Sequence, residues 1–393
     1  MTLQIDLPKQ FNVADYYILP NQTPERARKP YMYCGDHQLT YGELHAKANQ
    51  VGHALRKLGV EPEHRVMLLM LESLAFPVCF WGAIRIGAIS VPVNTMLSSK
   101  DYLYYLNDSR ARVLIVDAAL WPQIEPIQKQ LPHLRHIVIA NGSAAGRPSL
   151  DELLKSESTA LDTVLMSPDD QAFWLYTSGS TGDPKAAVHL HHDMVHVTET
   201  FTRQVLGLNE NDLTFSAAKF FFAYGLGNSL YFPMTVGARA VVQPARPAPD
   251  VIFDVLDKFK PTVFYGVPTL YNAMLNLYEA WLEGKNSPPS KLPTLKHLRF
   301  SVSAGEALPP DLFRRWKQHF GTPILDGIGS TEMLHIFISN RLDSIKPGSS
   351  GTVVPGYEVR LVDEFDKDVM DGEVGALLAK GDSGAAYYWN KHE

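Results

Sequence analysis

The sequence is poor in cysteine, with only Cys34 and Cys79 in 393 residues. Two cysteines exclude a disulfide framework, and they exclude a metal site built on cysteine alone. Long apolar runs are missing too. The longest run, 74–84, is too short to cross a bilayer and is flanked by the charged Glu72 and Arg85. The sequence therefore predicts a protein of a reducing compartment, by default the cytoplasm, with no membrane as partner.

A secretory signal and an excess of positive charge are also missing. The first residues, MTLQIDLPKQF, have neither the basic start nor the apolar stretch of a signal peptide. Lys and Arg number 36 against 42 Asp and Glu, which gives a net charge of −6. A nucleic-acid binder normally has the opposite sign, gathered on one face. The balance argues against nucleic acid as a partner. For the oligomeric state only the general frequency of twofold assemblies speaks, and it favours a homodimer.

What is present is the composition of a folded protein, with 45% hydrophobic and 20% charged residues. Residues 40–58 are patterned as an amphipathic helix, and Thr40 and Glu43 form a capping box at its start. A strand, helix and strand follow, which is the repeating unit of a parallel sheet. The expected strands are 65–70, 88–93, 112–116, 136–140, 172–176, 186–190, 262–265, 298–302 and 323–325; the expected helices are 71–86, 250–259, 268–283 and 309–320.

The alternation predicts an α/β fold in one large unit. We expect a first α/β sheet within 1–190 and a second one within 191–340. The tail, 341–393, changes character, because strand patterns at 357–363 and 374–380 flank a turn. It predicts a small, partial β-barrel subdomain.

The most specific motif is the run YTSGSTGDPK at 176–185, between two strand-like segments. Its glycines let the backbone turn tightly, its hydroxyls and successive N–H groups can surround an anion, and Lys185 adds a positive charge. The run is no Walker A loop, because the spacing differs and a strand pattern follows in place of a helix. The residues expected to bind phosphate are Thr177, Ser178, Gly179, Ser180, Thr181 and Gly182.

With this loop the chain resembles the acyl-adenylate-forming superfamily of acyl-CoA synthetases, peptide-synthetase adenylation domains and luciferases. Segments similar to the family's other motifs follow in the family's order, at 39–60, 82–94, 303–309, 327–332 and 375–390. Among the subgroups the chain is most similar to the benzoate–CoA ligases. The segments that carry this likeness are KFFFAYGLGNSLYFP (219–233) and LDGIGSTEMLHIFISN (325–340).

The resemblance implies an AMP-forming acid–thiol ligase. ATP activates an aromatic acid, of benzoate or 2-aminobenzoate type, to an aryl-adenylate, and coenzyme A then takes the acyl group. Lys185, Thr331 and Glu332 are the implied catalytic residues. Glu332 is the implied ligand of Mg²⁺, which prefers one or two carboxylates together with phosphate oxygens and water. Taken alone, Thr331 and Glu332 also fit the cap and first-turn acid of a helix.

Two binding regions are implied as well. Adenine is expected against Ala304, Gly305 and Glu306, with Asp326 and Gly327 at its edge. The aromatic ring is expected in a slot whose aromatic walls favour an aryl ligand. No acid occurs in 219–233, which argues against an α-amino acid substrate. The slot residues are Phe222, Ala223, Tyr224, Gly225, Gly327, Ile328 and His335.

Bland alternatives remain for several of these residues. One or two of the three phenylalanines 220–222 are expected in the core. His335, about one helical turn after Glu332, is expected on the same helix face, or else as a packed interior histidine. His191, His192 and Asp193 are expected on a strand, where neighbours point to opposite faces, which argues against a metal site.

The chain ends at Glu393, before the ribose-binding aspartate, the hinge and the small mobile C-terminal domain with which the family pattern continues. The expectation is a large N-terminal domain that binds ATP, arylate or adenylate more readily than it forms a thioester. Two alternatives stay open: a non-catalytic module that binds arylate and nucleotide, and an adenylating enzyme for a non-aromatic acid.

Overall fold

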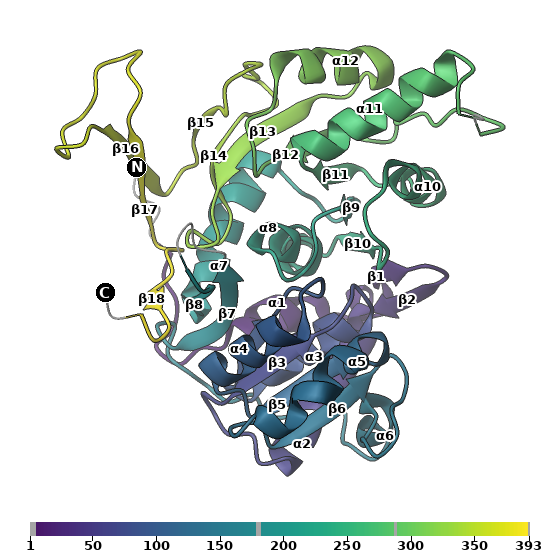
Figure 1. Ribbon diagram of the computed structural model, residues 1–393, viewed down its shortest axis with the longest axis vertical. Coiled ribbons are helices and arrows are strands. Elements are labelled where there is room, and N and C mark those ends of the chain that lie inside the picture. Colours follow the sequence, from purple (N-terminus) through teal and green to yellow (C-terminus); the bar gives the residue numbers. More distant parts are fainter. Residues whose placement is uncertain (1–4, 178–181, 287–288, 392–393) are drawn as a thin grey trace.

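The computed structural model describes residues 5–177, 182–286 and 289–391. Among these residues, one sheet has seven strands and lies in the purple and blue half of the molecule (Figure 1). Its strand order is β18-β8-β7-β4-β3-β5-β6. The strands are β3 (Arg65–Leu69), β4 (Ile89–Pro92), β5 (Val113–Asp117), β6 (His136–Ala140), β7 (Gln171–Thr177), β8 (Lys185–Leu190) and β18 (Tyr387–Tyr388).

A second sheet of nine strands has the order β15-β14-β13-β12-β11-β9-β10-β1-β2, and its strands β9 to β14 lie in the teal and green half (Figure 1). Strands β9 to β13 run parallel to one another, which is the arrangement that alternating strands and helices predict. The strands are β1 (Pro30–Cys34), β2 (His37–Thr40), β9 (Leu213–Ser216), β10 (Arg239–Val242), β11 (Val263–Gly266), β12 (Phe300–Ser303), β13 (Ile324–Gly329), β14 (Ile336–Ser339) and β15 (Thr352–Val353).

The helices cover both sheets and fill the space between them. Helix α2 begins with the expected capping box, since Glu43 N–H donates to Thr40 Oγ1 and Thr40 N–H donates to the Glu43 carboxylate. The α-helices are α1 (Val13–Ile18), α2 (Tyr41–Lys57), α3 (Ala75–Arg85), α4 (Ser99–Ser109), α5 (Trp121–Ile124), α6 (Leu150–Leu154), α7 (His191–Val197), α8 (Ala223–Leu226), α9 (Phe232–Val236), α10 (Pro249–Phe259), α11 (Pro268–Leu282) and α12 (Pro310–Phe320). Short 3₁₀ segments are η1 (Leu19–Asn21), η2 (Arg26–Arg28), η3 (Ala118–Leu120) and η4 (Glu125–Gln130), and π-helical turns are η5 (Thr198–Leu206) and η6 (Gly227–Tyr231).

Apolar residues on both faces of the parallel strands build a layered core. On β3, Val66 and Leu68 join the central cluster between the sheets, whereas Met67 and Leu69 join the cluster under α4 and α5. The second sheet alternates in the same way on β11, with Val263 and Tyr265 in the central cluster and Phe264 in the cluster under α10 to α12. Side chains of successive strand residues point to opposite faces, so strands buried on both sides read as continuous apolar runs. The expected α/β fold is confirmed.

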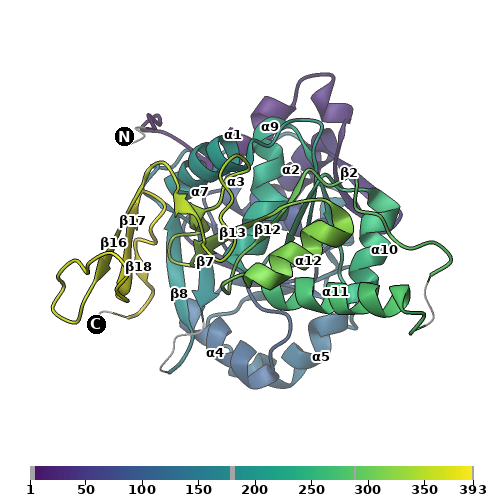
Figure 2. The same ribbon diagram turned by 90° about the horizontal axis from the view of Figure 1, so that it is seen from above.

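The boundaries between the expected subdomains are wrong in two places. Strands β1 and β2 pair with β10, so part of 1–190 belongs to the second sheet. Strand β18 pairs with β8, so the tail returns to the first sheet. Both pairings join segments far apart in the chain, which local patterns do not register. Among the described residues of the tail, β16 (Tyr357–Val362) and β17 (Ala376–Gly381) pair with each other in a two-stranded sheet that projects from the body (Figure 2). The partial β-barrel expected in 341–393 stays a prediction.

The prediction that His191, His192 and Asp193 lie on a strand is also wrong. Strand β8 ends at Leu190, and these residues form the first turn of α7. The Asp193 carboxylate accepts a hydrogen bond from the N–H of Leu190 and so caps the helix start. Within the described residues, no helix combines the length and the apolar composition that crossing a bilayer requires.

Candidate active site

A cavity of about 510 Å³ opens where successive parallel strands end. Residues directly after β9, β10, β11 and β12 line it, together with residues after β3 and β4 of the other sheet. Ligands of open α/β sheets bind outside the carboxyl ends of the strands, and this volume suits a small organic molecule. The lining residues are Leu71, Thr95, Met96, Ala217, Ala218, Lys219, Phe222, Ala223, Tyr224, Pro244, Arg246, Pro247, Val267, Leu270, Ala304, Gly305, Gly329, Ser330, Thr331, His335 and Ile336.

The segment after β9 supplies one wall of the cavity. Phe220 and Phe221 are buried, whereas Phe222 is 47% exposed and lines the cavity with Ala223 and Tyr224. The expectation that one or two of these phenylalanines are core residues is therefore confirmed. Gly225 lies outside the lining. It faces the backbone of its own segment, since a Cβ there would stand 2.2 Å from the carbonyl oxygen of Lys219.

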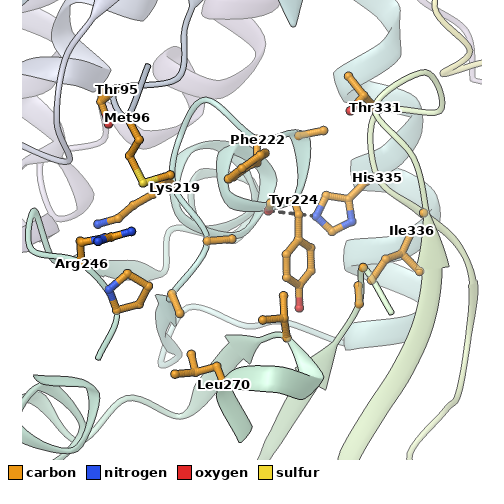
Figure 3. A pocket seen from close by; sticks show the side chains of 18 of the residues that line it. Thr95, Met96, Lys219, Phe222, Tyr224, Arg246, Leu270, Thr331, His335 and Ile336 are labelled. Atoms are coloured by element: carbon orange, nitrogen blue, oxygen red, sulfur yellow. Dashed lines mark hydrogen bonds between the residues drawn. The ribbon is translucent and has the colours of Figure 1, made fainter. Parts of the chain in front are cut away.

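Tyr224 and His335 face the cavity from two elements that are far apart in the chain (Figure 3). The Tyr224 hydroxyl donates to the carbonyl oxygen of Val302 at 3.0 Å, which fixes the ring beside β12. The His335 ring lies 5.5 Å from the Tyr224 ring, and its Nε2 lies 3.2 Å from Asn228 Oδ1 and 3.3 Å from the Tyr224 carbonyl oxygen. Both partners are acceptors, so Nε2 carries the proton. His335 is an interior histidine that also reaches the cavity.

Burial keeps the His335 ring neutral. It lowers the pKa of His335 to about 3, because a charged imidazole would lose its hydration without gaining an anionic partner. Nδ1 of this ring has no hydrogen-bond partner among the described residues. At this end of the cavity the ligand would meet the Tyr224 ring and an uncharged His335 ring.

The two remaining slot residues lie on β13. Gly327 faces Ser339 across the β13–β14 ladder, where a Cβ would stand 2.8 Å from the Ile338 carbonyl oxygen. Ile328 is 36% exposed. Neither belongs to the residues that line the described cavity, so their contact with substrate stays a prediction.

Of the residues expected around adenine, 304–306 follow the end of β12, and Asp326 and Gly327 lie within β13. Ala304 and Gly305 line the cavity, and Gly305 has a φ of 95°, a conformation that glycine adopts at little cost. Glu306 is exposed and lies outside the lining. Asp326 is buried and accepts a hydrogen bond from Ser350, and burial raises its pKa to about 6. Its Oδ1 has no partner among the described residues, which leaves an acceptor for a donor from a ligand.

The expected phosphate loop joins β7 to β8. These strands are antiparallel neighbours, with Thr177 opposite Lys185, and Gly182 has a φ of 107°. The strands expected before and after the loop are confirmed. Ser178, Gly179, Ser180 and Thr181 lie outside the described residues, so their phosphate contacts stay a prediction.

Thr331 and Glu332 lie in a turn between β13 and β14, and the alternative of a helix start is wrong. The antiparallel pairing of β13 with β14 needs a tight connection here. The Nε2 of His189 lies 2.9 Å from the Thr331 carbonyl oxygen, and its Nδ1 lies 2.7 Å from Asp193. The buried His189 thereby holds the turn against β8.

Glu332 and His335 face different surroundings, so the expected common helix face is absent. His335 lies in the interior, whereas Glu332 accepts a 2.6 Å hydrogen bond from the hydroxyl of Tyr388 on β18. Nζ of Lys185 lies 5.3 Å from the centre of the Tyr388 ring. Two of the residues expected in catalysis therefore meet at one tyrosine.

The Glu332 carboxylate fits the expected magnesium ion. Oε1 accepts from Tyr388, and Oε2 has no hydrogen-bond partner among the described residues. The described residues contain no group of three or more metal-ligating side chains close enough to hold a metal ion. A single carboxylate suits Mg²⁺, which takes its other ligands from phosphates and water.

Three residues at this site received no role from the sequence: Lys219, Arg246 and Tyr388. Lys219 and Arg246 lie at the cavity end opposite Tyr224 and His335 (Figure 3). Lys219 is the first residue of the segment that resembles the benzoate–CoA ligases, and this position could have pointed to a role for Lys219 at the site. Arg246 lies in a proline-rich loop, and Tyr388 is one of two neighbouring tyrosines, so no local pattern distinguishes them.

Comparisons of the sequence and of the structure with known proteins agree with one another. The family model described as AMP-binding enzyme matches residues 19–389. The benzoate–CoA ligase of Thauera aromatica is 45% identical over 391 residues, which cover 99% of this chain and 72% of that protein. A solved structure of the anthranilate CoA ligase AuaEII in complex with anthranoyl-AMP has a TM-score of 0.93 at 40% identity, covering 98% of this chain and 73% of that one.

A second solved structure, of a benzoate CoA ligase from Burkholderia xenovorans LB400, has a TM-score of 0.88 at 43% identity. It is covered to 74%, and this chain to 97%. The family match spans nearly the whole chain, and the Thauera relative is similar over nearly the same range. This chain therefore belongs to the family of AMP-binding enzymes.

Proposed function

We propose that this protein activates an aromatic carboxylic acid of the benzoate class with ATP and transfers the acyl group to coenzyme A. One observation carries the proposal. The same cavity is lined by Tyr224 and the neutral His335, which we take as its ring-binding end, and by Gly305 and Thr331. An aryl acid with its ring at Tyr224 would direct its carboxylate toward the turn that holds Thr331 and Glu332.

The ring-binding end favours a flat, uncharged group. Phe222 and Tyr224 supply aromatic surface, which prefers edge or offset contact with another ring. The uncharged His335 adds a third ring without the charge that would attract a second carboxylate. Benzoate and 2-aminobenzoate fit this chemistry, and proteins named for ligation of benzoate and of anthranilate are among the relatives.

The first reaction step brings two anions together. An oxygen of the carboxylate attacks the α-phosphorus of ATP, the bond to the β-phosphate breaks, and pyrophosphate leaves. Charge neutralisation and positioning supply most of the catalysis in such steps. Lys185 contributes a cation beside the phosphate loop, and the Thr331 hydroxyl donates to the α-phosphate. Mg²⁺, when bound at Glu332, supplies further neutralisation of phosphate charge.

The second step exchanges the acyl carrier. The sulfur of coenzyme A attacks the acyl carbon, the bond from this carbon to the phosphate oxygen breaks, and AMP leaves. The thiol proton goes to solvent. Asp326, whose buried Oδ1 has no hydrogen-bond partner among the described residues, is the residue we assign to the adenine amine in both steps.

A screen of pyrophosphate release over substituted benzoates tests the proposal. We expect ATP-dependent release with benzoate and with 2-aminobenzoate, and much less with hexanoate or phenylalanine at equal concentration. Release of AMP on addition of coenzyme A would then report the second step. Equal release with the aliphatic acid, or release with phenylalanine alone, would contradict the aromatic specificity.

A further inference from the structure

A buried ion pair at the cavity has no role in the reaction described above. Glu72 Oε2 lies 2.9 Å from Nζ of Lys219, and their side chains are only 6% and 14% exposed. Glu72 follows β3 of the seven-stranded sheet, whereas Lys219 follows β9 of the nine-stranded sheet. The pair therefore joins the two halves of the molecule at the cavity wall, which the Lys219 side chain lines (Figure 3).

Lys219 also holds the loop that follows β10. Its Nζ donates to the carbonyl oxygens of Gln243 at 2.6 Å and of Ala245 at 2.9 Å. The next residues of this loop, Arg246 and Pro247, line the cavity. One ammonium group thus fixes the loop through its backbone and is itself fixed by a carboxylate.

Glu72 holds the other wall of the cavity, which is the segment after β9. Its Oε1 accepts a 2.9 Å hydrogen bond from the N–H of Phe220, and the Phe220 ring stacks on Phe76 at a centroid distance of 4.4 Å. Phe222 and Tyr224 follow in the same short segment. The carboxylate therefore anchors the start of the segment that carries the ring-binding side chains.

Stability alone is a weak reason for such a pair. Burial of two charges costs hydration that their attraction offsets only with good geometry, and apolar residues of similar volume often stabilise a protein as well or better. Burial raises the pKa of the Glu72 carboxyl, against the opposing effects of Lys219 and the Phe220 N–H. What an apolar pair cannot supply is the set of hydrogen bonds to Phe220, Gln243 and Ala245.

We propose that Glu72 and Lys219 are positioning residues that hold the ring-binding segment and the Arg246 loop, the two walls of the cavity, at a fixed distance, a role that rests on the proposed function. The pair touches backbone on each wall and sets the distance between the ring-binding segment and the Arg246 loop. Loss of the pair leaves the nucleotide side, at Gly305 and Asp326, with its own contacts. Acid binding and nucleotide binding should therefore respond differently.

The test compares Glu72→Gln, Lys219→Met and the double variant with the wild type. Calorimetry gives separate dissociation constants for benzoate and for ATP, and thermal unfolding gives the stability. Asp15→Asn is the matched control, because it breaks the Asp15–Arg85 pair, which is also at 2.9 Å and largely buried but lies outside the cavity lining. We expect each single variant to raise the dissociation constant of benzoate at least about tenfold and that of ATP less than about twofold, in line with a broken buried pair.

The double variant separates positioning from charge burial. It leaves neither charge unpaired, so we expect it to regain thermal stability without regaining benzoate affinity, because methionine cannot bond to the loop carbonyls. It also carries the comparison if a single variant does not fold. Recovery of both properties, an equal loss for benzoate and ATP, or the same loss in Asp15→Asn would overturn the positioning role. A wild type that binds ATP and no aromatic acid would overturn the proposed function, and the positioning role with it.

Discussion

The hydroxyl of Tyr388 lies 2.6 Å from Oε1 of Glu332, although 56 positions separate the two residues in the chain. Further contacts hold the same tail segment against the turn, since the N–H of Ala385 donates to the Glu332 carbonyl oxygen at 2.6 Å. Burial and the Glu332 carboxylate raise the pKa of Tyr388 to about 12. Tyr388 therefore stays protonated at neutral pH and donates to the carboxylate we assign to magnesium.

Tyr388→Phe should raise the magnesium concentration that ATP binding requires. The substitution keeps the ring beside Lys185 and removes only the hydrogen bond that orients Glu332. A hydrogen bond to a charged group contributes about 1.5 to 3 kcal/mol, so the half-saturating Mg²⁺ concentration should rise roughly 10- to 150-fold. Titration of ATP binding against Mg²⁺ measures this.

Tyr387→Phe is the matched control on the same strand, because the Tyr387 hydroxyl contacts Gln171 and lies away from Glu332. An unchanged magnesium requirement in Tyr388→Phe would show that Tyr388 does not orient Glu332 for magnesium.

Gly227→Ala should reduce the affinity for the aromatic acid. A Cβ at this position would stand 2.6 Å from Cδ2 of His335 and 2.9 Å from Cζ of Phe232, so the histidine ring has to move. Overpacking of a core costs about 1 to 3 kcal/mol, and we expect benzoate to bind roughly tenfold more weakly. Calorimetry with benzoate measures the loss. Ser229→Ala, on the same π-helical turn, should leave the affinity unchanged, and an unchanged affinity in Gly227→Ala would exclude His335 from the ring-binding end.

Tyr224→Ala should weaken benzoate binding more than ATP binding, because the ring lines the cavity. Tyr224 is partly buried, and removal of a fully buried aromatic ring costs about 3 to 5 kcal/mol of folding free energy, so stability has to be measured in parallel. Tyr224→Phe keeps the ring and loses the hydrogen bond to Val302, and it should retain most of the benzoate affinity. Equal losses for benzoate and ATP in Tyr224→Ala would place this residue outside the acid site.

His191→Asn should flatten the dependence of stability on pH. Burial lowers the pKa of His191 to about 4, from 6.5 in the unfolded chain. Between these values the unfolded state binds a proton that the folded state does not, so the unfolding free energy falls as the pH falls, by up to about 1.4 kcal/mol per unit. Asparagine can accept the 3.1 Å hydrogen bond from Val13 without titrating. Denaturant unfolding at pH 7, 6 and 5 compares the slopes, and equal slopes would contradict a neutral buried His191.

Much of the fold follows from local patterns. Strand β6 begins and ends where the apolar run at 136–140 predicts, and helix α11 ends one residue before the expected 283. Such elements bury continuous apolar surface, which the sequence records directly. The turn at Thr331 could not be told from a helix start, because hydroxyl and acidic residues suit both. The β13–β14 pairing decides between them, and it depends on residues that local patterns do not compare.

The same limit applies to the site. The ring-binding segment and the Thr331 turn were identified by resemblance, and the structure brings Tyr224, His335 and Thr331 to one cavity. The contacts of Glu72 with Lys219 and of Glu332 with Tyr388 join segments from different sheets. Their partners become neighbours only when the chain has folded, so no spacing in the sequence points to them.

Binding of acyl-adenylate analogues tests the central claim most directly. Stable sulfamoyl analogues of benzoyl-, hexanoyl- and phenylalanyl-adenylate share the nucleotide and differ only in the acyl group. Calorimetry therefore measures how much the acyl group contributes to the binding affinity. The account predicts that the benzoyl analogue binds at least about tenfold more tightly than the other two, a difference of about 1.4 kcal/mol. Equal affinity for all three, or a preference for the phenylalanyl analogue, would contradict it.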